Sequence, residues 1–294
     1  MPQLDEIHFR DPFVLAVPEH GRHYLIGTPS YRTEAGAVSG LGSGLDVFVS
    51  RDLQSWEGPK TVFEPPAGFW GTRDFWAPEL HRYQGRFYIL CSFKAPDRCR
   101  GTHILVADDV LGPYEPLTDE PPTPRDWECL DGTLFVDDDD NPWMVFCHEW
   151  VQVGDGEICA VQLSDDLTRP IGDPTLLFTA SQASWVDAHP KAGCYVTDGP
   201  SLYRASDGGL LMTWSSFRAG QYAVGLARSA SGAVEGPWEQ MPTPLYDKDG
   251  GHGSVCRTLS GDLVLALHRP NRAPEERPLL LPFVERDGLL TLVS

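Results

Sequence analysis

The sequence predicts an all-β protein, a five-bladed β-propeller with four antiparallel strands in each blade. Two observations carry this prediction: five segments of similar pattern follow one another, and the composition is rich in turn-forming and aromatic residues. The 294 residues include 29 glycines, 26 prolines and 9 tryptophans, which is typical of a globular protein with many turns. Division by five leaves about 60 residues per repeat, enough for one four-stranded blade.

Each repeat opens with a predicted β-hairpin. A polar or acidic start leads into a short apolar run, a Gly, Asp or Asn turn, and a second run rich in aromatic and branched residues. Runs of this kind around such turns are hairpin signals, because the turn residues supply the backbone geometry that the flanking strands require. The hairpins are expected at residues 10–30, 77–93, 131–150, 198–217 and 251–270.

A third apolar run and a closing turn follow four of the hairpins, at residues 45–59, 102–116, 158–174 and 222–240. The last segment, residues 277–294, either completes the fifth blade or pairs with the N-terminus to close the ring. A β-sandwich or two smaller β domains would explain the strands but not the repeat. We therefore expect residues 1–294 to form a single domain.

The charge and the cysteines limit the partners and the compartment. With 23 basic and 42 acidic residues the net charge is −19, which repels nucleic acids and anionic membranes and favours a neutral ligand or a cation. Seven cysteines without a CxxC pair suggest reduced, buried thiols. No signal peptide is visible, so we expect a cytoplasmic protein, or a secreted one if a leader has been removed. The oligomeric state is left open.

Acidic residues recur where the five predicted first strands begin. In a propeller these strands surround one axis, so the residues at their starts are expected to converge: Asp11, Glu79, Asp131, Asp198 and His252. Like charges repel in one pocket and have no structural use there. Two chemistries need such a set: glycoside hydrolysis by paired carboxyl groups, and binding of a hard cation such as Ca²⁺ or Mg²⁺. The acidic run at 137–140 is instead expected to be a solvated turn.

Aromatic side chains near the same strand ends favour a sugar ligand, because an aromatic face suits a sugar ring. They include Phe13, Phe69, Trp70, Phe75, Trp76, Trp127, Trp150, Trp185 and Phe217. About half of them are expected to fill the core between blades. Long loops at 29–44 and 62–76 are expected to enclose the pocket.

Five sequence words resemble a known family when taken together. "RDPF", "WAPEL", "LDGTLFVDDDDNPWMVF", "DGPSLY" and "GHGSV", in this order and spacing, look like the blade-opening motifs of glycoside hydrolase family 43. The resemblance covers nearly the whole chain. It implies an inverting hydrolase of arabinose- or xylose-containing glycans, with Asp11 as general base, Asp131 tuning and orienting the acid, and Asp198 as general acid.

The sequence departs from this family at the acid. The family usually has Glu-Gly-Pro where this chain has Asp-Gly-Pro, and one missing methylene can move a proton donor by about 1 Å, which is enough to slow catalysis. Glu149 is the competing acid, because the second strand of the third hairpin should return it to the rim beside Asp131. We favour Asp198.

Further residues are expected to bind substrate or a cation. The substrate-binding candidates are Phe13, Trp76, Glu79, Trp150, Ser215 and Arg277. A guanidinium at the rim, such as Arg277, could lower the pKa of a nearby carboxylate, but a surface salt bridge is an equal alternative for it and for Arg10. The resemblance implies that His252 holds a cation, often calcium, through water; no organic cofactor is expected.

Three functions remain in competition. The leading hypothesis is an exo-acting α-L-arabinofuranosidase or β-xylosidase that acts on short neutral oligosaccharides. An endo-arabinanase would need an open groove, which the long loops disfavour. A carbohydrate-binding propeller without activity is the third, motivated by the shortened acid at Asp198.

Overall fold

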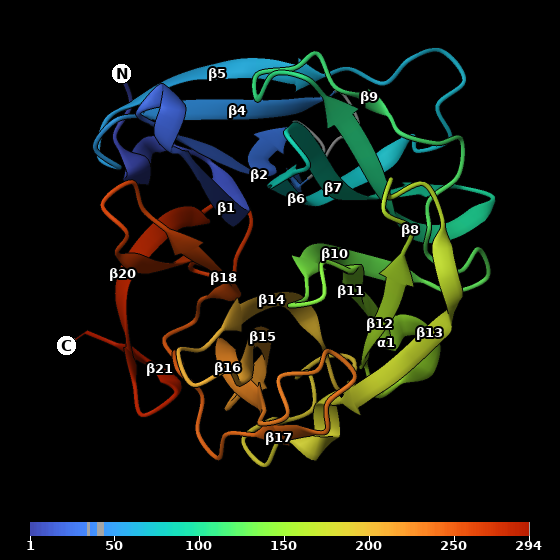
Figure 1. The fold of residues 1–294 in the computed structure, drawn as a ribbon, viewed down its shortest axis with the longest axis vertical. Helices are drawn as coiled ribbons and strands as arrows, with labels where there is room; N and C mark the ends of the chain where they lie inside the picture. Colours follow the sequence, from blue (N-terminus) through green and yellow to red (C-terminus); the bar gives the residue numbers. More distant parts are fainter. Residues whose placement is uncertain (34–35, 40–43, 294) are drawn as a thin grey trace.

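The chain folds into a ring of five antiparallel sheets, which confirms the predicted five-bladed propeller (Figure 1). This architecture is taken from a computed structural model that describes residues 1–33, 36–39 and 44–293. In every blade the first strand lies nearest the central axis and the later strands follow outward in chain order. The alternation of apolar runs and turns in the sequence therefore translates directly into blades.

The first two blades form the N-terminal part of the ring. Blade 1 contains β1 (Phe9–Val17), β2 (Arg22–Thr33), β4 (Leu45–Ser50) and β5 (Trp56–Phe63), with β3 (Gly36–Ser39) paired to β2. Blade 2 contains β6 (Arg73–Tyr83), β7 (Arg86–Ala95), β8 (Arg98–Ala107) and β9 (Glu115–Pro116).

The remaining three blades repeat this order. Blade 3 contains β10 (Cys129–Val136), β11 (Pro142–His148), β12 (Glu157–Leu163) and β13 (Pro170–Thr179). Blade 4 contains β14 (Asp198–Arg204), β15 (Leu210–Arg218), β16 (Gln221–Ser229) and β17 (Trp238–Gln240). Blade 5 contains β18 (Gly251–Arg257), β19 (Leu263–Arg269), β20 (Arg277–Arg286) and β21 (Leu289–Leu292).

Helical structure is confined to short connections. They are α1 (Trp150–Val153) and the 3₁₀ turns η1 (Leu4–Glu6), η2 (Pro18–His20) and η3 (Ala180–Gln182). Within the described ranges, no helix has the length and apolar character needed to cross a membrane.

The ring closes by side-chain packing between blades 1 and 5. The C-terminal segment completes blade 5 as β20 and β21, while the N-terminal Gln3 forms a bridge with Ser55 inside blade 1. Phe9 and Trp56 of blade 1 share an apolar cluster with Ala266 of blade 5. Of the two closures that the sequence left open, the structure therefore has the one in which each blade is continuous in sequence.

Two connections differ from the loops expected at 29–44 and 62–76. Strand β2 continues to Thr33 and pairs with β3, so much of the first loop is a hairpin. Residues 34–35 and 40–43 of that loop lie outside the described residues. Strand β5 continues to Phe63 and β6 begins at Arg73, which shortens the second loop to residues 64–72.

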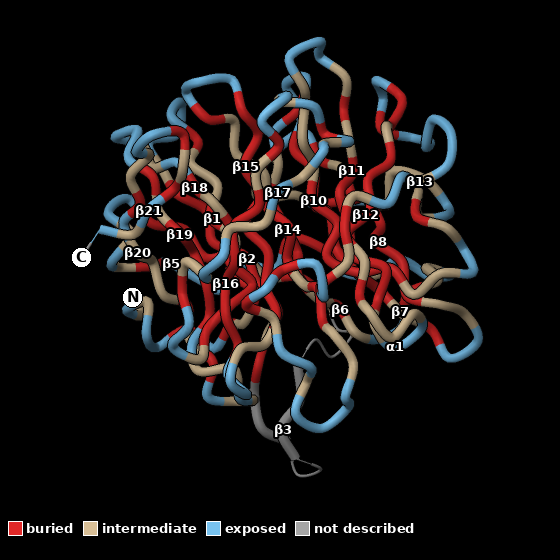
Figure 2. Tube along the Cα trace, turned by 90° about the horizontal axis from the view of Figure 1, so that it is seen from below, coloured by how far each residue is buried: buried red, intermediate tan, exposed pale blue. Residues whose placement is uncertain are grey.

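The smaller sequence predictions are confirmed. Residues 137–140 form the turn between β10 and β11, where Asp137 accepts hydrogen bonds from Asn141 and Trp143. All seven cysteines are free thiols, and five of them are buried: Cys91, Cys129, Cys147, Cys159 and Cys256. The buried interior of Figure 2 is thus a set of apolar sheets without covalent cross-links.

Candidate active site

A pocket of about 210 Å³ lies where the first strands of the blades begin, and all five blades contribute to it. Strands β1, β6, β10, β14 and β18 surround this region near the axis (Figure 1). The lining residues are Arg10, Asp11, Trp76, Leu130, Asp131, Glu149, Trp150, Asp198, Tyr222 and His252. Six of the residues predicted as site residues from the carboxylate and aromatic patterns therefore meet here, together with His252.

A β-bulge near the start of each first strand sets the direction of the pocket side chains. Asp11, Asp131 and His252 have left-handed backbones, with φ of 51°, 56° and 53°, and the strand register shifts at each of them. Such bulges often re-aim a side chain next to an active site. The equivalent residues in blades 2 and 4 are Ala77 and Gly199, with φ of 46° and 52°.

This register corrects one expectation. Glu79 and Asp198 were expected to be equivalent to Asp11, Asp131 and His252, but Glu79 lies two residues after the bulge residue of its blade and Asp198 lies one residue before. Of the five residues expected to be equivalent, only Asp11, Asp131 and His252 therefore occupy the same structural position. The hairpin pattern could locate the strand starts but not the single extra residue that each bulge inserts.

Each bulge is held by the neighbouring blade. Its backbone N–H donates to a side chain on the second strand of the preceding blade, at 2.7 to 3.1 Å: Ala77 to Thr28, Asp131 to Ser92, His252 to Ser215, and Asp11 to His268 Nδ1. In blade 3 the equivalent position is Cys147, and the Gly199 N–H donates instead to Asp131 Oδ2, at 3.0 Å. Asp131 is thereby fixed against the backbone next to Asp198.

Cationic and hydroxyl neighbours surround the Asp11 carboxylate. Its Oδ2 accepts a hydrogen bond from Thr28 Oγ1 at 2.8 Å, and its Oδ1 lies 3.3 Å from Arg10 Nε. His268 Nδ1 and His252 Nδ1 lie 3.4 and 3.5 Å from the same oxygen. Burial alone would raise the pKa of Asp11, but the Arg10 guanidinium above all, helped by the hydrogen bond from Thr28, holds this pKa below its ordinary value. Asp11 is therefore ionised at neutral pH.

The pKa of the Asp198 carboxyl is shifted in the opposite direction from that of Asp11. Burial, and then the nearby Asp131, raise the pKa of Asp198 to about 7, although the hydrogen bond from Tyr222 works against this rise. The Tyr222 hydroxyl donates to Asp198 Oδ2 at 2.8 Å. One pocket thus contains a carboxylate without a proton and a carboxyl that keeps its proton near neutrality.

Asp131 lies in the same pocket as Asp11 and Asp198. Burial, followed by the charge of Asp11, raises the pKa of Asp131 well above its ordinary value, while the bond from the Gly199 N–H lowers it. Its Oδ2 also lies 3.6 Å from His252 Nδ1. Three buried carboxyl groups this close repel one another when charged, so ionisation of one raises the pKa of the others, and Asp11, beside Arg10, is the first to lose its proton.

Glu149 lies at the pocket wall and is paired with a cation. Its side chain is buried, and Arg100 Nε lies 3.4 Å from its Oε2. The same guanidinium lies 3.2 Å from Asp74 and 3.9 Å from the centre of the Trp76 ring. Burial raises the pKa of Glu149, and Arg100 opposes this rise. Glu149 is thus part of an ion-pair network that also supports Trp76.

Two predicted substrate-binding residues are absent from the pocket lining. The Glu79 carboxylate is buried and lies 2.9 Å from His81 Nε2. The Phe13 ring packs against the ring of the same histidine, with 5.1 Å between centroids. Both residues therefore lie in the packing between blades 1 and 2.

Ser215 and Arg277 also do not line the pocket. The buried Ser215 hydroxyl accepts the His252 N–H, so it supports a pocket residue from behind. The Arg277 guanidinium donates to the carbonyl of Pro274 and lies 3.1 Å from His8 Nε2. The cationic neighbour of Asp11 is instead Arg10.

Three pocket residues were given no definite role from the sequence: Arg10, Leu130 and Tyr222. Arg10 was left between a site residue and a surface salt bridge, although it directly precedes Asp11. Tyr222 begins the third run of the fourth repeat, which was given no part in the site from the sequence. The available signal was its place directly after the β15–β16 turn, which returns the chain to the pocket rim.

The described part of the chain contains no cluster of side chains suited to direct metal binding. Among the described residues, no three His, Cys, Asp or Glu side chains are placed to ligate one ion. His252 directs its Nδ1 toward two carboxylates, Asp11 and Asp131. These residues do not fit a directly coordinated ion.

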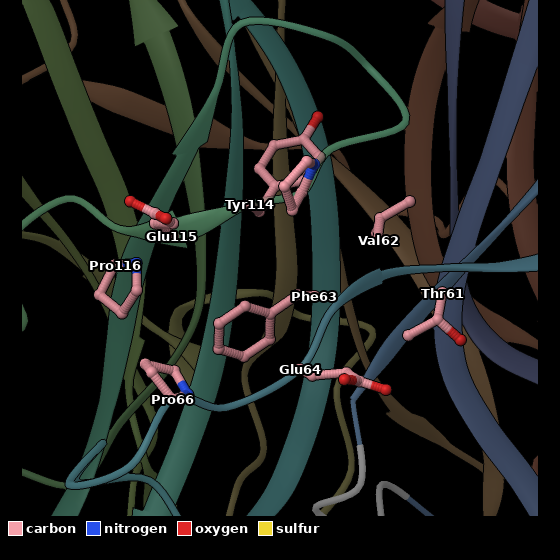
Figure 3. A pocket seen from close by; sticks show the side chains of 9 residues that line it. Thr61, Val62, Phe63, Glu64, Pro66, Tyr114, Glu115 and Pro116 are labelled. Atoms are coloured by element: carbon pink, nitrogen blue, oxygen red, sulfur yellow. The ribbon is translucent and has the colours of Figure 1, made fainter.

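A larger cavity of about 480 Å³ lies between β5 and β9, far from this chemistry (Figure 3). The rings of Phe63 and Tyr114 are buried beneath it, and its carboxylates, Glu64 and Glu115, are exposed. It offers neither a shielded acid nor an open aromatic face. The smaller axial pocket is therefore the candidate active site.

Comparison with known proteins gives a family match over most of the chain. The family model described as "Glycosyl hydrolases family 43" matches residues 6–288. The structure is similar to that of an endo-arabinase from Bacteroides thetaiotaomicron VPI-5482, with 42% sequence identity over 97% of this chain and 98% of the other, and a TM-score of 0.89.

Two curated relatives are more distant. The extracellular exo-α-(1→5)-L-arabinofuranosidase ArbA of Cellvibrio japonicus (strain Ueda107) is 26% identical over 73% of this chain and 65% of its own length. The extracellular endo-α-(1→5)-L-arabinanase 1 of Bacillus subtilis (strain 168) is 25% identical over 43% of this chain and 44% of its own length. The matches thus span only about half to two thirds of these relatives.

Proposed function

The chain belongs to glycosyl hydrolase family 43, and from this premise we propose that it hydrolyses α-L-arabinofuranosyl linkages in neutral oligosaccharides. The observation that carries the proposal is the placement in one pocket of Asp11 beside the Arg10 guanidinium and of Asp198 beside the neutral Tyr222 hydroxyl, surroundings in which the pKa values of the two carboxyl groups shift in opposite directions. Glycoside hydrolysis requires one carboxyl group that donates a proton and one carboxylate that activates water or attacks the sugar. The arabinose preference is supported by the names of the relatives.

In the proposed mechanism the two aspartates act on opposite sides of the scissile bond. Asp198 protonates the glycosidic oxygen as the bond breaks, and Asp11 removes a proton from the attacking water. Arg10 keeps Asp11 ionised, and Asp131 keeps the pKa of Asp198 raised and fixes the adjacent backbone through Gly199. Attack by water in one step inverts the anomeric configuration.

Glu149 takes a binding role in this proposal. Its ion pair with Arg100 favours the charged form, which is unsuited to donating a proton. A charged carboxylate can instead accept hydrogen bonds from sugar hydroxyls, while the rings of Trp76 and Trp150 pack against the sugar.

The limited pocket volume, about 210 Å³, supports exo action on a chain end. Endo action is the second candidate, because the structure that is 42% identical is named an endo-arabinase. Digestion of linear arabinan separates them: monosaccharide as the first product supports exo action, and a ladder of oligosaccharides supports endo action.

The roles of the two acids are tested with D198A and E149A on aryl α-L-arabinofuranosides. A substrate with a good leaving group needs little protonation, so D198A should retain most activity on a dinitrophenyl substrate and lose about 10²- to 10⁴-fold on arabino-oligosaccharides. E149A should lose similar factors on both substrates, mainly through KM. The matched control, E115Q in the other cavity, should behave as wild type. The reverse pattern would assign the acid to Glu149.

A substrate panel tests the reaction itself. We expect faster hydrolysis of the α-L-arabinofuranoside than of the β-D-xyloside or β-D-galactoside, with the inverted anomer as the first product by NMR. Binding of arabino-oligosaccharides without turnover of any aryl glycoside would instead support the carbohydrate-binding hypothesis.

Calcium binding near His252, through water, stays a prediction. Calorimetry with Ca²⁺ after chelation should give heat and an increase in Tm, and H252A should abolish both. No heat and no stabilisation of the wild type would rule out this prediction.

The compartment is also a proposal. Seven free cysteines favour a reducing cytoplasm, whereas both curated relatives are named as extracellular. Fractionation of the native host separates these alternatives.

A further inference from the structure

The Tyr222 hydroxyl makes a direct hydrogen bond to the Asp198 carboxyl. The donor and acceptor oxygens are 2.8 Å apart, and the tyrosine side chain is 1% exposed. Both residues line the pocket, but they come from different strands of blade 4: Asp198 begins β14 and Tyr222 lies at the start of β16. The bond thus joins the start of the blade's innermost strand to its third strand.

The tyrosine ring is held on two sides. A Cβ added at Gly251 would lie 2.4 Å from the ring, so only glycine allows the backbone of β18 to come this close. The imidazole of His268 stacks on the ring at 26°, with 5.7 Å between centroids. That histidine accepts the Asp11 N–H through Nδ1, and its Nε2 lies 3.2 Å from Asn271 Oδ1. The ring therefore has little freedom to move away from Asp198.

We propose that Tyr222 is a positioning residue that adapts the active site to a short acid, Asp198, by fixing its carboxyl group at the reach that proton transfer requires. This inference rests on the proposed function of Asp198. An Asp side chain is one methylene shorter than a Glu, and displacement of a proton donor by about 1 Å can cost about 10²-fold in rate. The rigid Tyr222 hydroxyl limits the motion of the Asp198 carboxyl, which would otherwise add to this displacement.

The hydrogen bond also selects which oxygen carries the acidic proton. A protonated carboxyl has one oxygen that donates and one that accepts. Because the Tyr222 hydroxyl donates to Oδ2, that oxygen is the acceptor and the proton lies on Oδ1. The bond therefore orders both the position and the orientation of the proposed acid.

Leaving-group dependence of Y222F tests this role. The variant removes one oxygen and keeps the ring in its packing. We expect kcat to fall about 10- to 100-fold on phenyl α-L-arabinofuranoside and less than about 3-fold on the dinitrophenyl substrate, with KM little changed on both. The matched control is Y114F, which removes the hydroxyl of another buried tyrosine that donates to a carbonyl, that of Val110. An equal loss on both substrates would show general structural damage and overturn the proposal.

Two Asp198 variants sharpen the test. In D198A, adding Y222F should cause no further loss, since a positioning residue has nothing left to position. D198E should be less active than wild type, because the longer carboxyl meets the tyrosine hydroxyl already 2.8 Å from Oδ2, and Y222F should recover part of this loss. Additive losses of activity in the D198A/Y222F double variant would overturn the proposal. A D198E variant as active as wild type would also overturn it.

A measurement without substrate separates this inference from the proposed function. In protein labelled with ¹³C at the Asp carboxyl carbons, the Asp198 resonance is assigned by its loss in D198N. It should shift in Y222F and not in Y114F; an unchanged resonance overturns the pairing even if the enzyme is active. Lack of hydrolysis by the wild type refutes the proposed function, whatever the resonance shows.

Discussion

Asp11 and Asp198 are chemically identical side chains in one pocket, and their neighbours alone separate their behaviour. Asp11 lies beside Arg10 and accepts a hydrogen bond from Thr28, whereas Asp198 has Asp131 as its nearest charged influence and a neutral donor, Tyr222. Burial raises the pKa of both, but the guanidinium reverses the effect at Asp11 only. A pair with separated pKa values is what acid–base catalysis needs.

The separation predicts the pH dependence of kcat/KM. Asp198 must be protonated to act, so activity on arabino-oligosaccharides should fall as the pH rises through about 7. Asp11 must be ionised, and its lowered pKa should keep the base active down to acidic pH. With a dinitrophenyl substrate the fall above neutrality should disappear, because that leaving group needs no proton. A fall at the same pH with both substrates would assign it to another group.

Sequence reasoning could find the three aspartates because each belongs to a repeated word at the start of a hairpin. Asp11 and Asp131 even share the same bulge position in their blades. Tyr222 could not be found in this way, since its contact with Asp198 depends on how β16 returns beside β15. Contacts within one hairpin follow from local pattern, while contacts across a sheet require the assembled blade.

At the scale of elements, the bulges connect neighbouring blades through specific backbone groups. Gly199, which directly follows the proposed acid Asp198, shows why glycine is needed at this bulge position. Its φ is +52°, and an added Cβ would lie 2.8 Å from Cγ of the His252 ring in the next blade. Glycine is therefore required twice, for the left-handed backbone and for the close approach of β18.

G199A should therefore lower stability more than a glycine substitution that only strains a left-handed backbone and meets no neighbouring atom. The control is G21A, because Gly21 has a similar φ of +57° and an added Cβ there would have no neighbour within 4 Å. We expect G21A to reduce the free energy of unfolding by about 1–2 kcal/mol and G199A by about 2–5 kcal/mol. Denaturant unfolding measures both. Equal losses would mean that contact with His252 contributes nothing.

The register of these bulges explains why Glu79, unlike Asp198, was wrongly expected in the pocket lining. A hairpin pattern indicates where a strand begins, but a bulge inserts a residue that leaves no clear mark in the sequence. Ala77 occupies the bulge position of blade 2, and Glu79 is instead directed to His81 between blades 1 and 2. The fold therefore followed from the repeat, whereas the depth of each side chain in the channel did not.

At the scale of the whole molecule, the ring has one seam that no chain connection spans. Blades 1 and 5 meet through an apolar cluster that includes Phe9, Trp56 and Ala266, and through hydrogen bonds such as that from Ser254 Oγ to the Pro12 carbonyl. The other four boundaries between blades are each crossed by the chain. Blades 1 and 5 are consequently held together by non-covalent contacts alone, without a connecting segment of chain.

Loss of packing at the seam should open the ring there first. F9A removes a buried ring from the cluster between blades 1 and 5, and F178A removes an equally buried ring from the cluster between blades 3 and 4. Both should cost about 3–5 kcal/mol in the free energy of unfolding. Hydrogen exchange should differ: F9A should speed exchange in β1, β18 and β19, including the amide of Asp11, while F178A, whose blades stay connected by the chain, should leave those strands protected. Faster exchange spread evenly over all blades in F9A would mean that the ring unfolds as one unit and that the seam is not a weak point.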